Sequence, residues 1–237
     1  MSMHVAELWR YPVKSLYGEP LEATELTEDG VPGDRQVHVR WRHNLESDVL
    51  TGRTRHGLLT LRAVTGPDGQ PLIEGLPWDS PKAAELVTST VGHEAELARY
   101  AGSERFDILP LLVATDGAIE HFGYSGRRLR PNLVIGGVPG LAERGWPGKA
   151  LRIGEALIGV ESLRGRCIVT TIDPHTGRQN LDVLRSIQRK YEGKLALNCW
   201  VAEGGVIRRG DPVEVVDADL PYPPRGGWIM GMPYLVP

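Results

Sequence analysis

One of the chain's two cysteines, Cys167, stands in a segment whose residue types could activate a thiol. A β-branched run at 168–172 follows it, and Asp-Pro-His-Thr-Gly at 173–177 supplies the residues of a turn. The guanidinium groups of Arg164 and Arg166 favour the thiolate, which is the form that attacks electrophiles or binds a soft metal. The competing interpretation is a small buried hydrophobic residue in a strand, which is common for free cysteines.

Further cationic side chains stand beside turns or strand ends, at Lys14, Arg35, Arg53 and Arg130. Hydroxyl and amide groups accompany them, at Ser15, Thr51, Thr115, Asn132, Thr170 and Thr171. Such a set suits a ligand with a phosphate and several hydrogen-bonding groups, with one thiolate aimed at its reactive centre. Thiolate is also a preferred ligand of soft or high-valent transition metals. The alternative for the arginines at 127–130 is a solvated basic strand edge that prevents aggregation between strands.

The composition limits the class of protein. The chain has 237 residues, of which 41% are hydrophobic and 24% charged, as in soluble globular proteins. Its net charge of -3 argues against general nucleic-acid binding, which needs an excess of Lys and Arg. No apolar run approaches the roughly 18 residues of a membrane span, and the first residues lack the core of a signal peptide. We therefore expect a cytoplasmic protein without a nucleic-acid or membrane partner.

The two cysteines also limit the redox chemistry. They are too few for a cysteine-ligated zinc site or an iron–sulfur cluster, each of which takes about four ligands, mostly thiolates. If the protein catalyses a redox reaction, its electrons must come from a separate electron-donor protein. Cys199 lies between Asn198 and Trp200 in an apolar segment, and we interpret it as a packed core thiol.

Short strands joined by Gly- and Pro-rich turns predict a mixed, β-rich α+β fold, a β-barrel with a few short helices rather than a sheet of βαβ units. Helices are predicted after Asp79-Ser80-Pro81, at 116–122, and after Asn180, while 106–115 is predicted to be a buried strand. An irregular stretch near residue 100 suggests an N-terminal β subdomain at 1–100 and a second domain at 101–217. The Pro- and Gly-rich tail at 218–237 keeps large apolar side chains, so we expect it to pack on the body or on a partner chain, which is compatible with a homo-oligomer.

Six motifs occur in the order seen in MOSC-domain proteins. They are Tyr-Pro-Val-Lys-Ser at 11–15, Gly-Asp-Arg at 33–35, Leu-Thr-Gly-Arg at 50–53, Arg-Leu-Arg-Pro-Asn-Leu-Val at 128–134, Arg-Cys through Asp-Pro-His-Thr-Gly at 166–177, and Ile-Arg-Arg-Gly-Asp-Pro-Val at 207–213. The chain most resembles the branch that includes the mitochondrial amidoxime-reducing component, with its N-terminal MOSC subdomain. The resemblance implies a β-barrel that binds the molybdenum cofactor (Mo-molybdopterin), a pterin dithiolene with a terminal phosphate.

The same resemblance implies roles for individual residues. Cys167 would be the molybdenum ligand, and Asp173 would lie near the metal in the same loop. The pterin and its phosphate would be held by Lys14, Ser15, Arg35, Arg130 and Asn132, with Thr115 facing the cofactor and Arg53 and Arg166 as further contacts. This set coincides with the cations and the thiolate that the residues alone nominate.

The expected function is a molybdenum-dependent oxidoreductase that reduces N-hydroxylated or other N- or S-oxygenated small molecules by oxygen-atom transfer. Two alternatives stay open. Cys167 could carry a persulfide and transfer sulfur, or the protein could be a non-catalytic carrier of the molybdenum cofactor.

Overall fold

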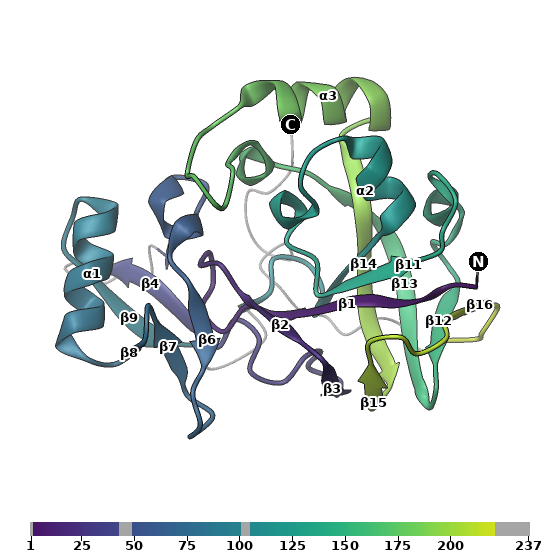
Figure 1. Ribbon diagram of the computed structural model, residues 1–237, viewed down its shortest axis with the longest axis horizontal. Coiled ribbons are helices and arrows are strands. Elements are labelled where there is room, and N and C mark those ends of the chain that lie inside the picture. Colours follow the sequence, from purple (N-terminus) through teal and green to yellow (C-terminus); the bar gives the residue numbers. More distant parts are fainter. Residues whose placement is uncertain (1, 43–48, 101–104, 221–237) are drawn as a thin grey trace.

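The computed structural model describes residues 2–42, 49–100 and 105–220, and shows a β-rich fold with three α-helices (Figure 1). The largest sheet has eight strands in the order β16-β12-β13-β14-β10-β11-β1-β2. Their bounds are β1 His4–Arg10, β2 Glu19–Leu21, β10 Leu111–Thr115, β11 Leu133–Gly136, β12 Ala150–Ile153, β13 Ala156–Gly165, β14 Lys194–Glu203 and β16 Glu214–Val216. All neighbouring strands in it are antiparallel except β10 and β11, which run parallel.

The predicted α+β class is confirmed, whereas a closed β-barrel is not seen in the described part of the chain. The hydrogen-bonded order of the large sheet begins at β16 and ends at β2, and these two strands are not paired with each other. Both edge strands have three residues. Strands this short offer few backbone groups through which the sheet could continue to closure.

Smaller sheets lie beside the large one. β4 Val37–Trp41 pairs with β5 Val49–Leu50 and β9 Ala95–Arg99, and β7 Pro71–Ile73 pairs with β6 Ala63–Thr65 and β8 Leu76–Pro77. β3 Ala23–Leu26 pairs with β15 Gly205–Arg208. The first two of these sheets, with α1, share an apolar core that includes Val39, Leu58 and Val87, separate from the core of the large sheet.

The first hundred residues nevertheless contribute to both parts of the fold, because β1 pairs with β11 in the large sheet. The division at residue 100 therefore stays a prediction. The predicted packing of the tail falls mainly on residues 221–237, which lie outside the described residues.

The three predicted helices are confirmed as α1 Pro81–Val91, α2 Asp116–Phe122 and α3 Leu181–Tyr191. Ser80 caps α1 by accepting a hydrogen bond from the N–H of Ala83, and Gly92 ends it with a φ of 74°. Asn180 caps α3 in the same way. In Figure 1, α2 and α3 lie on one side of the large sheet, where their apolar faces pack together through Phe122 and Ile187. None of the described helices is long and apolar enough to cross a membrane.

Candidate functional site

A narrow pocket of about 90 Å³ brings together six of the residues to which the resemblance gives a role at the cofactor, and Thr51 and Arg164 line it as well. The six are Lys14, Ser15, Arg35, Arg53, Arg130 and Cys167. These residues come from loops after β1, before β4, after β5, before β11 and after β13. Segments that are far apart in the sequence thus surround the thiol with cations.

Three of these residues hold a backbone conformation that side-chain-bearing residues seldom adopt. The φ angles of Ser15, Arg35 and Arg130 are 70°, 52° and 57°, in the left-handed region. Each costs about 1 kcal/mol or more and persists only because the surrounding structure imposes it. For Arg35 that constraint includes a 2.7 Å hydrogen bond from its N–H to the carbonyl of Tyr11. Three of the six non-glycine residues with a left-handed φ in the described part of the chain therefore line this pocket, and such strain is common at ligand sites.

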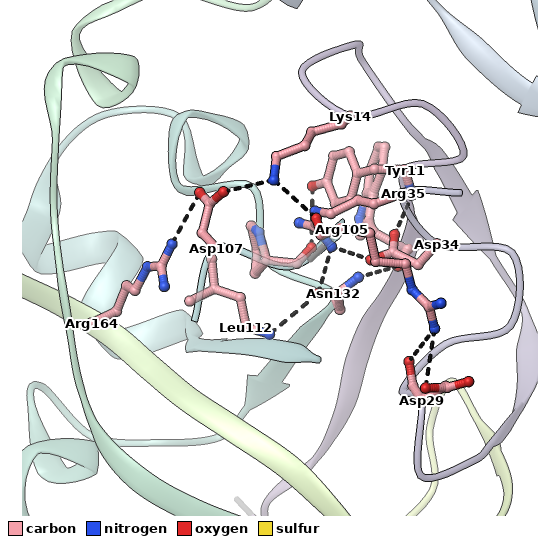
Figure 2. Close-up of polar contacts among 12 residues, drawn as sticks. Tyr11, Lys14, Asp29, Asp34, Arg35, Arg105, Asp107, Leu112, Asn132 and Arg164 are labelled. Atoms are coloured by element: carbon pink, nitrogen blue, oxygen red, sulfur yellow. Dashed lines mark hydrogen bonds and ion pairs between the residues drawn. The ribbon is translucent and has the colours of Figure 1, made fainter. Parts of the chain in front are cut away.

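Asp107 lies at the centre of the cationic groups, and the sequence analysis did not nominate it (Figure 2). Its carboxylate is 3.1 Å from Nζ of Lys14, 3.2 Å from Nη2 of Arg53 and 3.3 Å from Nη2 of Arg164. Burial acts to raise its pKa, but Lys14, Arg164 and Arg53 outweigh burial and hold that pKa well below the usual range. Asp107 is thus a fixed anion that organises three cations.

Asp107 is not predicted as a site residue because the apolar pattern of residues 106–115 predicts one buried strand. Only Leu111–Thr115 is a strand, and the residues before it form bends up to Pro110. An ionisable residue inside an otherwise apolar run was the available signal, since Asp is almost never fully buried without a partner.

Two arginines, the half-buried Arg130 and the buried Arg166, have no carboxylate partner in the described part of the chain. Nη2 of Arg130 has no hydrogen-bond partner, and its guanidinium carbon lies 4.3 Å from the centroid of the Tyr11 ring. Arg166 donates from Nη2 to the carbonyl of Leu129 at 2.8 Å, while its Nε has no partner. Burial lowers the pKa of each guanidinium to about 10. Such groups are costly to bury and indicate a site for an anion.

Asn132 lies behind Arg35 rather than in the narrow pocket. Its Oδ1 accepts hydrogen bonds from the N–H of Leu112 at 3.2 Å and from Nη1 of Arg35 at 3.4 Å. Its Nδ2 donates to the carbonyl of Trp9 at 3.3 Å. Asn132 therefore joins β10 to β1 and positions Arg35, which also forms an ion pair with Asp34.

Thr115 does not line the narrow pocket. Its side chain is fully buried, caps α2 by accepting from the N–H of Ala118 at 3.1 Å, and donates to Oε2 of Glu143 at 3.3 Å. Its position at the end of β10 directs the hydroxyl toward the first turn of α2 because capping requires that geometry.

The residues after Cys167 form a 3-10 helix, Ile168–Thr171, instead of an extended run. Thr170 donates to the carbonyl of Cys167 from both its N–H, at 3.1 Å, and its hydroxyl, at 2.8 Å. The helix therefore begins at the cysteine, which is half-buried. Cys199 is buried in β14, where burial raises the pKa of its thiol, so its predicted role as a core residue is confirmed.

Asp173 shapes this loop and does not line the narrow pocket. Burial acts to raise its pKa, but the N–H groups of His175 and Thr176 and the guanidinium of Arg128 hold it below the usual range. Its carboxylate is engaged by the turn that follows the 3-10 helix, and its predicted place near the metal stays a prediction.

Arg128 holds the loop that follows Cys167 through three hydrogen bonds. It donates from Nη1 to the carbonyls of Thr170 and Thr171, at 3.4 and 3.0 Å, and from Nη2 to Oδ2 of Asp173 at 2.9 Å. We expect Arg128→Ala to lower the free energy of unfolding by about 2–3 kcal/mol, because three hydrogen bonds from a buried charge are lost. The reaction of Cys167 with a chromogenic disulfide is expected to accelerate several-fold at the same time, since the loop gains freedom.

Arg185→Ala is the matched control for this prediction. Arg185 forms only an exposed pair with Asp182, so its loss should change the free energy of unfolding by less than about 0.5 kcal/mol. An unchanged thiol reaction rate in Arg128→Ala would show that Arg128 does not hold the cysteine.

Residues 117–214 match the family model of the MOSC domain. The resemblance to MOSC-domain proteins that is expected from the six motifs is thereby confirmed. The chain is 26% identical to human mitochondrial amidoxime-reducing component 1 over 88% of this chain and 82% of that protein, and 25% identical to human component 2 over the same shares. It is 32% identical to molybdenum cofactor sulfurase 2 of Culex quinquefasciatus, over 38% of this chain and 12% of that protein.

Among solved structures, the YuaD protein of Bacillus subtilis aligns with a TM-score of 0.47 and 13% identity, over 92% of this chain and 98% of that chain. YiiM of Escherichia coli aligns with a TM-score of 0.35 and 23% identity, over 48% of this chain and 58% of that chain.

Proposed function

We propose that the narrow pocket binds the molybdenum cofactor and that Cys167 provides the protein ligand to the metal. The observation that carries the proposal is the half-buried guanidinium of Arg130, which lines this pocket and whose buried Nη2 lacks a partner, beside the cations Lys14, Arg35 and Arg53. A pterin dithiolene with a terminal phosphate is anionic and rich in hydrogen-bonding groups, so it fits these donors. The names of the relatives, which include molybdenum cofactor sulfurases, support the same ligand.

Different residues of the pocket would contact different groups of such a ligand. Lys14, Arg35 and Arg130 would offset the charge of the phosphate and pterin, and Ser15 would offer a hydroxyl. Asp107 keeps Lys14 and Arg53 in place through its two ion pairs. Because these contacts exist in the protein alone, the site is largely formed before the ligand enters, which reduces the entropic cost of binding.

The proposed reaction is the reduction of an N-hydroxylated or other N- or S-oxygenated small molecule. When the substrate is N-hydroxylated, its N–O bond breaks, two electrons and two protons are consumed, and the oxygen leaves as water. The cofactor, when bound, supplies the two-electron chemistry, and a separate electron-donor protein supplies the electrons. The homology of the chain to amidoxime-reducing components over most of their length supports this reaction class.

The first experiment measures molybdenum by elemental analysis and oxidised pterin by fluorescence, on protein made in a host that synthesises the cofactor. We expect about one molybdenum and one pterin per chain, and a clear loss of metal in Cys167→Ala. Cys199→Ala is the matched control, because it removes the other thiol from the core and should keep the cofactor.

Other results of this experiment would favour one of the two alternative functions. Absence of both molybdenum and pterin in the parent would contradict the proposal, and a cyanide-releasable sulfur on Cys167 would then indicate a sulfur carrier. A full complement of cofactor with no turnover of any oxygenated substrate would indicate a carrier of the cofactor.

A further inference from the structure

A second, wider cleft of about 290 Å³ adjoins the narrow pocket. Four residues line both cavities: Arg53, Asp107, Arg164 and Cys167. The thiol therefore stands where the two cavities meet. If a ligand fills the narrow pocket, the cleft remains open, and a second molecule could approach Cys167 and the bound ligand through it.

Arg164 is fixed across this cleft by contacts on both sides. Its Nη2 lies 3.3 Å from Oδ2 of Asp107, and its Nη1 donates to Oδ1 of Asn198 at 3.2 Å. Asn198 in turn donates from Nδ2 to the hydroxyl of Ser162 at 3.0 Å. Because Asn198 and Ser162 are register partners in β14 and β13, Arg164 is held by the sheet and not by a mobile loop.

The charge of the cleft is positive. Its lining contains the guanidiniums of Arg53, Arg164 and Arg166, while Asp107 is the single carboxylate among the described residues that line it. That one carboxylate is shared with Lys14 as well, so it cannot neutralise all the cations around it. The contacts to Asp107 and Asn198 use two of the five N–H groups of the Arg164 guanidinium.

We propose that this cleft is the substrate subsite and that it selects anionic substrates, small N- or S-oxygenated molecules that carry a carboxylate, with Arg164 as the specificity-determining residue. This inference rests on the proposed function for the reaction itself. Ile108 and Leu163 provide apolar walls for the body of the molecule, and Arg164 provides a planar guanidinium that matches a carboxylate. A positively charged cleft also disfavours cationic molecules of the same shape.

The kinetic test uses the cofactor-loaded full chain and two N-hydroxylated aromatic amidines of equal size, one with a para-carboxylate and one with a para-carboxamide. We expect kcat/KM to favour the carboxylate by about tenfold or more, the size of one charge-assisted hydrogen bond. In Arg164→Gln the preference is expected to fall to within about twofold, while Arg164→Lys restores part of it because the charge returns. Arg185→Gln, an exposed arginine outside the cleft, should keep the full preference.

A binding test is independent of turnover. Benzoate and benzamide are titrated into the protein and followed by ligand-observed NMR, in the parent, in Arg164→Gln and in Arg185→Gln. We expect benzoate to bind better than benzamide in the parent, to lose this advantage in Arg164→Gln, and to keep it in Arg185→Gln, because Arg185 lines neither cavity. The melting temperature of each variant verifies that it folds.

The outcomes separate the two proposals. Equal binding of benzoate and benzamide, or equal kcat/KM for the two amidines, overturns the inference of an anionic subsite. If neither amidine is reduced but benzoate binding depends on Arg164, the subsite stands and the proposed reaction fails.

Discussion

Replacement of Arg130 by methionine is expected to abolish retention of the molybdenum cofactor while leaving the cofactor-free protein as stable as before or more stable. The side chain of Arg130 is half-buried, its buried Nη2 has no partner, and loss of contact with water lowers its pKa to about 10. The charge is therefore held in an environment that disfavours it. Methionine has a similar length, carries no charge, and can remain packed against Tyr11.

The expected magnitudes have opposite signs in the two measurements. Molybdenum content should fall below about one tenth of the parent, because a charge-assisted contact to the ligand is lost. The free energy of unfolding of cofactor-free protein, measured in urea, should rise by about 1–3 kcal/mol, as when buried charges are exchanged for apolar groups. The left-handed backbone at this position costs the same for both residues, since neither is glycine.

Arg130→Lys is the matched control for charge. It keeps a cation in the pocket, so partial cofactor retention and no gain in stability are expected. If Arg130→Met unfolds more easily and still retains a full complement of molybdenum, Arg130 serves the fold and not the ligand.

Replacement of Asp107 by asparagine is expected to destabilise the cofactor-free protein. The substitution preserves the shape of the side chain but leaves Lys14, Arg53 and Arg164 facing one another without their shared anion. Loss of one partner from a buried ion pair costs about 3–5 kcal/mol. The carboxylate is 32% exposed, so water screens part of the repulsion, and we expect a decrease of about 2 kcal/mol at pH 7.

The difference in stability between the parent and Asp107→Asn should depend on pH in one direction. The pKa of Asp107 in the folded protein lies well below its usual range, so the folded state stays ionised where the unfolded state already takes up a proton. The stabilisation is therefore complete above the unfolded pKa of about 4 and decreases as the pH falls below it. Urea unfolding of both proteins between pH 8 and pH 3 measures this difference.

Sulfate provides a second readout for the same variant. The three cations without Asp107 should bind this anion better than in the parent, so sulfate should raise the melting temperature of Asp107→Asn by more. Asp217→Asn is the control, because Asp217 is 88% exposed and pairs only with Lys149 at the surface. A loss of stability in Asp107→Asn no larger than in this control would contradict the central role of Asp107.

The local chemistry of this protein was readable from the sequence. Ser80 and Asn180 predict the starts of two helices, since their side chains accept hydrogen bonds from N–H groups in the first turn that follows. Cys167 lies close to Arg164 and Arg166 and is followed by a turn, so its near neighbours alone indicate a reactive loop. Charge, hydrogen-bonding capacity and turn preference are properties of a residue and its near neighbours, and the sequence by itself determines them.

Tertiary structure decided which of these side chains meet and which are used elsewhere. Asp107 joins Lys14, 93 positions away, only because the chain between them folds back, and nothing local marks that pairing. The hydroxyl of Thr115 and the carboxylate of Asp173 have the right chemistry for the site but are engaged by α2 and by the turn after Cys167. A polar group binds the partner that the fold brings within about 3 Å, so its final role depends on contacts between distant segments.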